Sequence, residues 1–234
     1  MIVTIPKSGT HLFGKCVSKI LKDVFVLEKL SKDINITAFH HQDLIKKEIW
    51  DDKLLRDFNK VIIGIRDLRD VLVSFVFWMD KRSRSMHKSL KDYPMLAFLN
   101  WSKMSFDEKL LTIIKGDFPY PFNFFEYEVE QTLKVLKYPS YCISKFEDLV
   151  GDKGGGSRML QEMEINKIAK YLDKDLSKDE ITKIADRLFG HTWTFRSGQI
   201  GEWRKYFKDI HKHVFKEKYG AYLIDFGYEE NYNW

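Results

Sequence analysis

The chain has 234 residues, of which 44% are hydrophobic and 15% aromatic. That is enough material for one domain with a sizeable core, so we expect a single domain over residues 1–234. The 39 basic and 34 acidic residues leave a net charge of +5, which describes an ordinary solvated surface and excludes a polybasic nucleic-acid binder. Cys16 and Cys142 lie far apart and form no C-x-x-C pair, so neither a disulfide framework nor a zinc site is predicted.

The sequence carries no pattern typical of export or membrane insertion. Residues 1–6 form a short apolar run that leads directly into Lys-Ser-Gly, without the long apolar stretch and small-residue cleavage site of a signal peptide. No segment approaches the roughly 18 consecutive apolar residues of a membrane span. We therefore expect a soluble, cytoplasmic protein in a reducing compartment, with no stable membrane insertion.

Strands and helices alternate in the first part of the chain. Residues 1–5 are β-branched and apolar without alternation, which is typical of a parallel strand covered on both faces. Residues 11–22 carry apolar residues at helical spacing. Further strands are predicted over residues 34–40 and 60–65, and a helix over residues 68–79. The pattern favours an α/β fold of the P-loop type, with three layers and a central, mainly parallel sheet flanked by helices.

The second part of the chain continues this alternation. A fourth strand is predicted over residues 138–144, and the glycine run at residues 154–157 predicts a flexible loop. Amphipathic helices are expected over residues 159–172 and 177–188, the second of which begins with a capping box.

Between the first strand and the first helix lies the hexapeptide Pro6-Lys7-Ser8-Gly9-Thr10-His11. Backbone N–H groups and the helix N-terminus can cradle a phosphate there, while the lysine neutralises its charge. The pattern is not Walker A, because the lysine precedes the glycine and the loop is shorter. The alternative is a plain strand-to-helix turn with a surface lysine.

A second charged segment, I-R-D-L-R-D-V-L-V-S, occupies residues 65–74 at the end of another predicted strand. The planar guanidinium of Arg66 would make a strong charge-assisted contact with phosphate, and Ser74, two helical turns along, could reach the same anion. The alternative is an arginine-rich helix start with salt-bridged aspartates. A third segment, F-R-S-G-Q-I-G-E-W-R-K-Y-F, spans residues 195–207.

In chain order, these three motifs resemble those of the sulfotransferases that use 3′-phosphoadenosine 5′-phosphosulfate (PAPS), namely the cytosolic-type enzymes and their bacterial relatives. The family's patterns are P-K-S-G-T, R-[DN]-P-[RK]-D-x-x-x-S and R-K-G-x-x-G-x-W-x-x-x-F. The chain departs from them at three positions: His11 replaces a hydroxyl residue, Leu68 a proline and Ser197 a lysine.

The resemblance implies a role for each motif in holding the nucleotide. It assigns Lys7 to the 5′-phosphate and the bridging oxygen, with further loop contacts from Ser8, Gly9, Thr10 and His11. It assigns the 3′-phosphate to Arg66, Ser74 and the loop that carries Arg196, Ser197 and Gly198.

Two aromatic residues are candidates for contact with the adenine. Phe146 begins F-E-D-L, which resembles the family's Y-E-D-L, and Trp193 lies near the place of the family's T-S-F segment. Either ring could equally belong to the core.

A histidine is the natural base near neutral pH. The family carries its base in a K-T-H-L-P segment, and this chain has F-H-H-Q-D at the corresponding place. We choose His41 as the base and keep His40 as the alternative, since only one of two neighbouring strand residues normally faces a given side. The other possibility is that both are surface histidines and a carboxylate serves instead.

The sequence thus predicts a sulfotransferase that moves a sulfuryl group from PAPS to a hydroxyl or amine by in-line displacement, releasing 3′-phosphoadenosine 5′-phosphate (PAP). The resemblance calls for no metal, because lysine and arginines supply the charge. We expect a small-molecule or glycan acceptor and no nucleic-acid partner, and the oligomeric state is left open. The alternatives are a P-loop kinase or other nucleotide-dependent phosphotransferase, and a non-catalytic nucleotide-binding relative.

Overall fold

The computed structural model describes residues 1–22, 25–27, 36–40, 60–86, 100–117, 125–190 and 195–234. The chain divides into two compact units. The first unit comprises Met1–Arg66 and Gln131–Ile200, and the second comprises Asp67–Glu130 and Gly201–Trp234. A single domain over residues 1–234 stays a prediction.

The first unit contains a five-stranded parallel sheet in the order β2-β3-β1-β4-β5. Its strands are β1 (Ile2–Thr4), β2 (Phe25–Leu27), β3 (Ile36–His40), β4 (Ile62–Ile65) and β5 (Cys142–Lys145). The predicted α/β class with a parallel sheet is confirmed. So are the strands predicted over residues 1–5, 34–40 and 60–65, within a few residues at each end.

The sequence prediction missed β2 and placed the start of β5 too early. Three residues are too few for a strand pattern to emerge, so Phe25–Leu27 gave no signal. Before β5, the backbone N–H of Tyr141 donates to the carbonyl of Tyr138 at 3.3 Å, closing a turn around Pro139. The proline lacks an N–H for the ladder, which is why the strand begins only after this turn.

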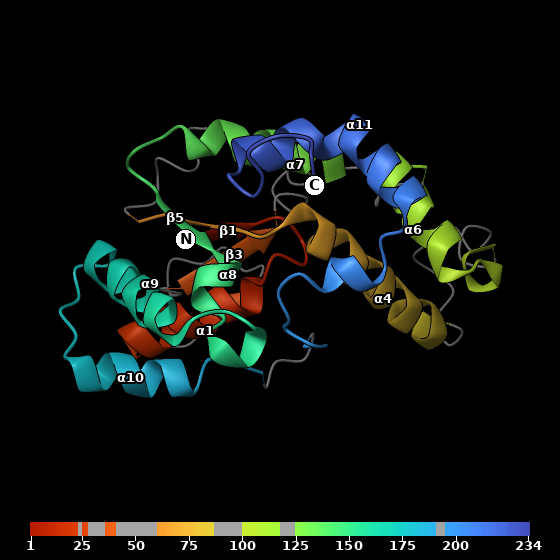
Figure 1. Cartoon of the computed structure of the whole chain (residues 1–234). Helices are drawn as coiled ribbons and strands as arrows, with labels where there is room; N and C mark the ends of the chain where they lie inside the picture. Colours follow the sequence, from red (N-terminus) through yellow and green to blue (C-terminus); the bar gives the residue numbers. More distant parts are fainter. Residues whose placement is uncertain (23–24, 28–35, 41–59, 87–99, 118–124, 191–194) are drawn as a thin grey trace. The chain divides into compact units, whose positions relative to one another are not determined.

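Helices cover one side of the sheet of the first unit (Figure 1). They are α1 (Thr10–Leu21), α8 (Phe146–Leu149) and α9 (Arg158–Tyr171), and α10 (Lys178–Asp186) packs on α9 and α1. The helices predicted over residues 11–22, 159–172 and 177–188 are therefore confirmed, as is the capping box of Ser177 and Glu180.

A glycine lets α1 pack tightly against this sheet. A β-carbon at Gly64 in β4 would lie 2.4 Å from the ring of Phe13, which is fully buried on α1. No real contact is that short, so the ring occupies the space that a larger residue at position 64 would need. This packing fixes the helix that begins at the predicted phosphate loop.

The second unit is helical. It contains α4 (Leu68–Met86), α6 (Phe106–Lys115), the short 3-10 helix η3 (Glu202–Lys205) and α11 (Asp209–Asp225), while α7 (Phe125–Leu136) spans the boundary between the units. The predicted helix over residues 68–79 continues to Met86, because neither glycine nor proline interrupts it. Among the helices described, none is long and apolar enough to cross a membrane.

Candidate nucleotide-binding site

The segment between β1 and α1, here called the lysine loop (residues 6–11), forms a tight turn. The N–H of Ser8 donates to the carbonyl of Ile5 at 3.1 Å. Lys7 and Gly9 both have left-handed backbones, with φ of 71° and 94°. Gly9 must be a glycine for a second reason, since a β-carbon there would lie 2.6 Å from Cδ2 of Phe146. A glycine at position 9 therefore lets the backbone of the lysine loop approach the ring of Phe146 closely.

The start of α1 is suited to an anion. The N-cap residue is Gly9, which has no side chain to cap the helix, and the first turn contains no acidic residue. The hydroxyls of Thr4 and Thr10 share a 2.6 Å hydrogen bond, which ties the strand to the first residue of the helix. A helix N-terminus carries a partial positive charge, and here no carboxylate in the first turn offsets it.

Ser8 provides an observation that points to a ligand. Its side chain is fully buried, and its hydroxyl has no hydrogen-bond partner among the residues that the structure describes. A buried hydroxyl without a partner costs about 1–3 kcal/mol. A phosphate oxygen would accept this hydrogen bond, so the lysine loop is suited to an anion.

Lys7 and His11 interact electrostatically within this loop. Burial lowers the pKa of His11 below its ordinary value of 6.5, and the positive charge of Lys7 lowers it further. Both effects favour the neutral form of the imidazole. A nearby phosphate dianion would have the opposite effect on its pKa, because an anion favours the charged form of the ring.

Arg66, the first residue after β4, connects two of the three sequence motifs. Only 6% of its surface is exposed. Its Nη1 donates to the carbonyl of Lys7 at 3.4 Å, and its Nη2 donates to the carbonyl of Gln199 at 2.9 Å. One guanidinium thus joins the lysine loop to the loop of the third motif, although 59 and 133 residues separate Arg66 from its two partners.

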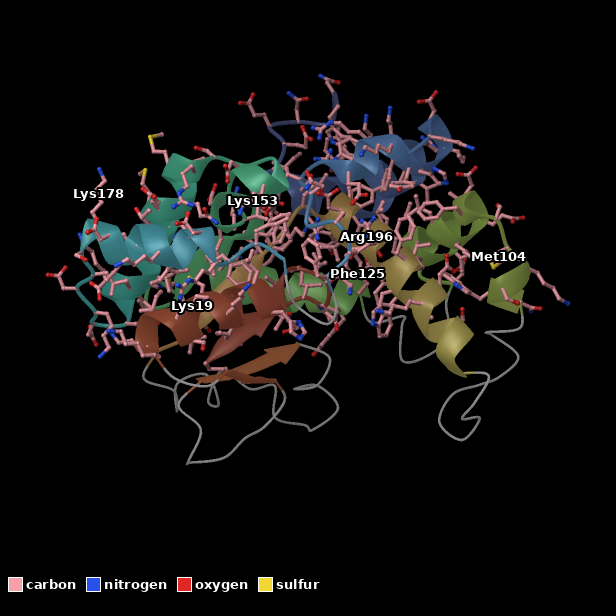
Figure 2. All side chains as sticks on the ribbon, turned by 90° about the horizontal axis from the view of Figure 1, so that it is seen from below. Lys19, Met104, Phe125, Lys153, Lys178 and Arg196 are labelled. Atoms are coloured by element: carbon pink, nitrogen blue, oxygen red, sulfur yellow. The ribbon has the colours of Figure 1, made fainter. Side chains whose placement is uncertain are left out.

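The loop of the third motif, here called the arginine loop (residues 195–200), rests on a turn of the same unit. The Nε2 of Gln199 donates to the carbonyl of Lys153 at 2.9 Å, and the N–H of Ile200 donates to the carbonyl of Gly154 at 2.9 Å. Arg196 itself is exposed, and Ser197 and Gly198 are half-buried. Lys153 and Arg196 mark the two segments in Figure 2.

The sequence prediction missed the role of this turn. Residues 151–156, here called the glycine turn, contain a 3-10 helix, η2 (Asp152–Gly154), closed by hydrogen bonds to the carbonyls of Gly151 and Asp152. The loop predicted at residues 154–157 begins where η2 ends, and residues 155–157 form a turn and irregular chain. A β-carbon at Gly154 would lie 2.7 Å from the carbonyl oxygen of Gly198, so this glycine lets the arginine loop approach. The density of glycines was the signal, since close backbone contact also requires them.

Within the second unit, the rest of the second motif has a structural role. Arg69 is buried and pairs with Asp67 at 2.7 Å and with Glu229 at 2.6 Å. Its Cζ lies 4.0 Å from the ring centroid of Trp203 and 4.3 Å from that of Trp234. For Arg69 and Asp67, the alternative of a salt-bridged helix start is therefore correct.

The neighbouring carboxylate of Asp70 fixes the second half of the third motif. It is almost fully buried and accepts hydrogen bonds from the N–H groups of Gly201 and Trp203, both at 2.8 Å. Trp203 is also buried. Asp70 thus holds the backbone that follows the arginine loop.

Ser74 and Phe146 have contrasting surroundings. Ser74 is half-buried on α4 in the second unit. Phe146 begins α8 in the first unit and is only 5% exposed. The guanidinium of Arg66 lies over its ring, with Cζ 4.2 Å from the centroid. An adenine could stack on that face only if Arg66 moved away.

The candidate bases lie largely outside the described residues. His41 and Trp193 are not among them, and of His40 only the backbone is described, at the end of β3. There it pairs in register with Thr4 of β1, the strand that leads into the lysine loop. His211 is fully buried and has a structural role, since its Nδ1 accepts from the N–H of Lys208 at 3.0 Å at the start of α11.

No protein-family model matches the sequence, and no curated protein matches it. The structure, in contrast, is similar to solved proteins. Mouse sulfotransferase SULT7A1, complexed with PAP, is 18% identical with a TM-score of 0.64, over 95% of this chain and 82% of that one. Retinol dehydratase, in complex with androsterone and the inactive cofactor PAP, is 16% identical with a TM-score of 0.61, over 95% of this chain and 79% of that one.

This likeness identifies the fold of the chain. The chain has a sulfotransferase fold, and the resemblance seen in its three motifs is confirmed at the level of the fold.

The backbone of Lys7 generates a stability prediction. A β-carbon in the left-handed region costs about 1 kcal/mol, and glycine avoids most of that cost. We expect Lys7→Gly to be more stable than Lys7→Ala by about 0.5–1 kcal/mol in urea denaturation. Both variants lose the ammonium group, so the difference reports the backbone alone.

The matched control is Lys19, on α1 and labelled in Figure 2. There the order should reverse, with Lys19→Ala more stable than Lys19→Gly by about 1 kcal/mol, because alanine favours a helix. A Lys7→Ala variant as stable as Lys7→Gly would contradict the left-handed turn.

Proposed function

We propose that this chain is a PAPS-dependent sulfotransferase, an enzyme that transfers a sulfuryl group to an acceptor hydroxyl or amine. The observation that carries the proposal is Arg66, whose guanidinium donates to both the lysine loop and the arginine loop in a chain with a sulfotransferase fold. The two loops that the sequence assigns to opposite ends of one nucleotide are thereby held by a single cation.

The lysine loop would bind the 5′ end of the nucleotide. In this proposal Lys7 neutralises the 5′-phosphate, the backbone of Gly9 and Thr10 surrounds it, and the buried hydroxyl of Ser8 and the ring of His11 complete the contacts. The helix N-terminus and the buried Ser8 hydroxyl support this assignment.

The 3′-phosphate would lie against Arg66, with Ser74 and the arginine loop completing its site. Arg196 adds a second positive charge from an exposed position, and Ser197 and Gly198 contribute donors from the loop. A guanidinium and a phosphate form paired, charge-assisted hydrogen bonds, which is why an arginine suits this position better than a lysine. Trp193 remains the proposed neighbour of the adenine.

When bound, PAPS supplies the sulfuryl group for in-line transfer. Lys7 would stabilise the negative charge that develops on the leaving phosphate oxygen. His41, with His40 as the alternative, would take the proton of the acceptor. In this account the cationic side chains carry the charge stabilisation, and no metal is assigned a role.

The acceptor is proposed to be a small molecule. The retinol dehydratase structure, whose fold is similar, holds androsterone, which supports a small acceptor ahead of a glycan. The net charge of +5 suits an anionic cosubstrate. A cytoplasmic location and a single catalytic domain over residues 1–234 are part of the same proposal.

Calorimetric titration with PAP tests the proposal. We expect Arg66→Ala to weaken PAP binding by roughly 10- to 150-fold, because it removes charge-assisted hydrogen bonds to a dianion. Binding of AMP, which lacks the 3′-phosphate, should weaken less than binding of PAP, and this comparison separates the lost contact to the 3′-phosphate from the effect on the lysine loop. Arg187→Ala, at an exposed position after α10, is the matched control and should behave as wild type.

Unchanged PAP affinity in Arg66→Ala would contradict the assignment. Binding of ATP with Mg²⁺ together with no binding of PAP would favour a kinase instead. Tight PAP binding without transfer of labelled sulfate to any acceptor would favour a non-catalytic relative.

The histidine in the lysine loop predicts proton uptake on binding. In the free protein, burial and Lys7 hold the pKa of His11 below 6.5. A phosphate dianion beside the ring raises that pKa, so PAP binding takes up protons in the window between the two values. Affinity should therefore strengthen as pH falls through this window.

Calorimetry in two buffers with different ionisation enthalpies measures the uptake. His11→Asn should lose the uptake due to the imidazole and keep only the proton release from the nucleotide's own phosphates, whose pKa falls beside positive charges. Equal uptake by the variant and the wild type would show that His11 is not close to the anion.

A further inference from the structure

Phe146 lies against two parts of the proposed nucleotide site, Arg66 and the lysine loop. It is the first residue of α8, directly after β5, and its ring is almost fully buried. The Cζ of Arg66 lies 4.2 Å from the ring centroid. On the lysine loop, a β-carbon at Gly9 would come within 2.6 Å of Cδ2 of the same ring. One aromatic side chain therefore lies against both Arg66 and the lysine loop.

The ring restricts Arg66 in a way that the hydrogen bonds alone do not. The two carbonyl contacts hold the guanidinium edge, and the contact from Nη1 to Lys7 is long at 3.4 Å. The face of the guanidinium lies over the ring of Phe146, where a cation–π contact is strongest when desolvated. Edge and face contacts together fix the plane of the group.

We propose that Phe146 is a positioning residue for Arg66, and that it sets the guanidinium plane for the 3′-phosphate instead of serving as an adenine platform. The inference rests on the proposed function. An arginine without this support samples many rotamers, and ordering it when the ligand binds weakens affinity. Because Phe146 is only 5% exposed, its ring offers little surface for stacking with a base. Its effect on nucleotide affinity therefore acts through Arg66.

Calorimetric titration with three nucleotides distinguishes the role of Phe146 as a positioning residue from a role as an adenine platform. PAP carries both phosphates and adenine, AMP lacks the 3′-phosphate, and cytidine 3′,5′-bisphosphate keeps both phosphates with a smaller base. The variants are Phe146→Leu, which removes the ring, and Phe146→Tyr, which keeps it. The matched control is Phe215→Leu in the second unit, whose fully buried ring packs on Tyr219 at a centroid distance of 5.3 Å.

We expect Phe146→Leu to lose roughly 3- to 30-fold in PAP affinity, the range of a desolvated cation–π contact, and to leave AMP affinity unchanged. The preference for PAP over AMP falls, while the preference for PAP over cytidine 3′,5′-bisphosphate stays as in wild type. Phe146→Tyr keeps both preferences at their wild-type values, and Phe215→Leu changes neither. In an Arg66→Ala background, Phe146→Leu should have no further effect on the preference for PAP over AMP.

Two results would overturn the inference. If Phe146→Leu reduces AMP affinity and the preference for adenine over cytosine, the ring is an adenine platform. If all three nucleotides weaken by the same factor, the ring has only a general packing role. Wild-type protein that binds no PAP would instead refute the proposed function, so the two failures are distinguishable.

A measurement on wild-type protein covers the case in which Phe146→Leu does not fold. The side-chain protons of Arg66 should show upfield ring-current shifts in NMR spectra of the free protein. We expect PAP to leave these shifts in place. Their loss on addition of PAP would mean that the nucleotide displaces Arg66 from the ring, which contradicts the inference.

Discussion

The candidate site depends on one buried cation. Arg66 leaves β4 almost without solvent exposure, and burying a charge is costly unless hydrogen bonds and counter-charge compensate for it. Two backbone carbonyls and the electron-rich face of Phe146 supply part of that compensation. A phosphate would add a negative charge beside the guanidinium, so the side chain that joins the two loops is also suited to bind a nucleotide.

In the second unit, buried charged side chains also hold segments that are distant in the sequence, and one of these side chains is a carboxylate. The buried carboxylate of Asp70 accepts two backbone N–H groups, and Arg69 lies against two tryptophan rings while pairing with two carboxylates. Arg66, Arg69 and Asp70 lie within five consecutive residues of the sequence, yet each fixes a different segment of the chain. This explains why the second motif combines positive and negative residues so densely.

Much of this arrangement follows from the sequence. The short parallel strands, the helix after the lysine loop and the positions of Lys7 and Arg66 are readable because apolar periodicity and phosphate chemistry both leave local patterns. Contacts between distant segments leave no such pattern. The carbonyl of Gln199, which accepts from Arg66, could be any residue, and the burial of Phe146 depends on Gly9, far away in the chain.

The structure of the glycine turn could not be predicted from its sequence either. Its composition is equally compatible with a flexible linker and with a close backbone approach, and only the packing of Gly154 against Gly198 distinguishes the two. His40 and His41 illustrate a third case, since adjacent residues on a strand share a pattern but not a direction.

The most direct test of the central claim is a crystal structure of the chain with PAP. The account predicts the 5′-phosphate on the backbone of residues 7–11 and the 3′-phosphate within hydrogen-bond distance of Arg66, whose guanidinium still covers Phe146. A nucleotide whose 3′-phosphate lies away from Arg66, or which binds outside the two loops, would contradict it.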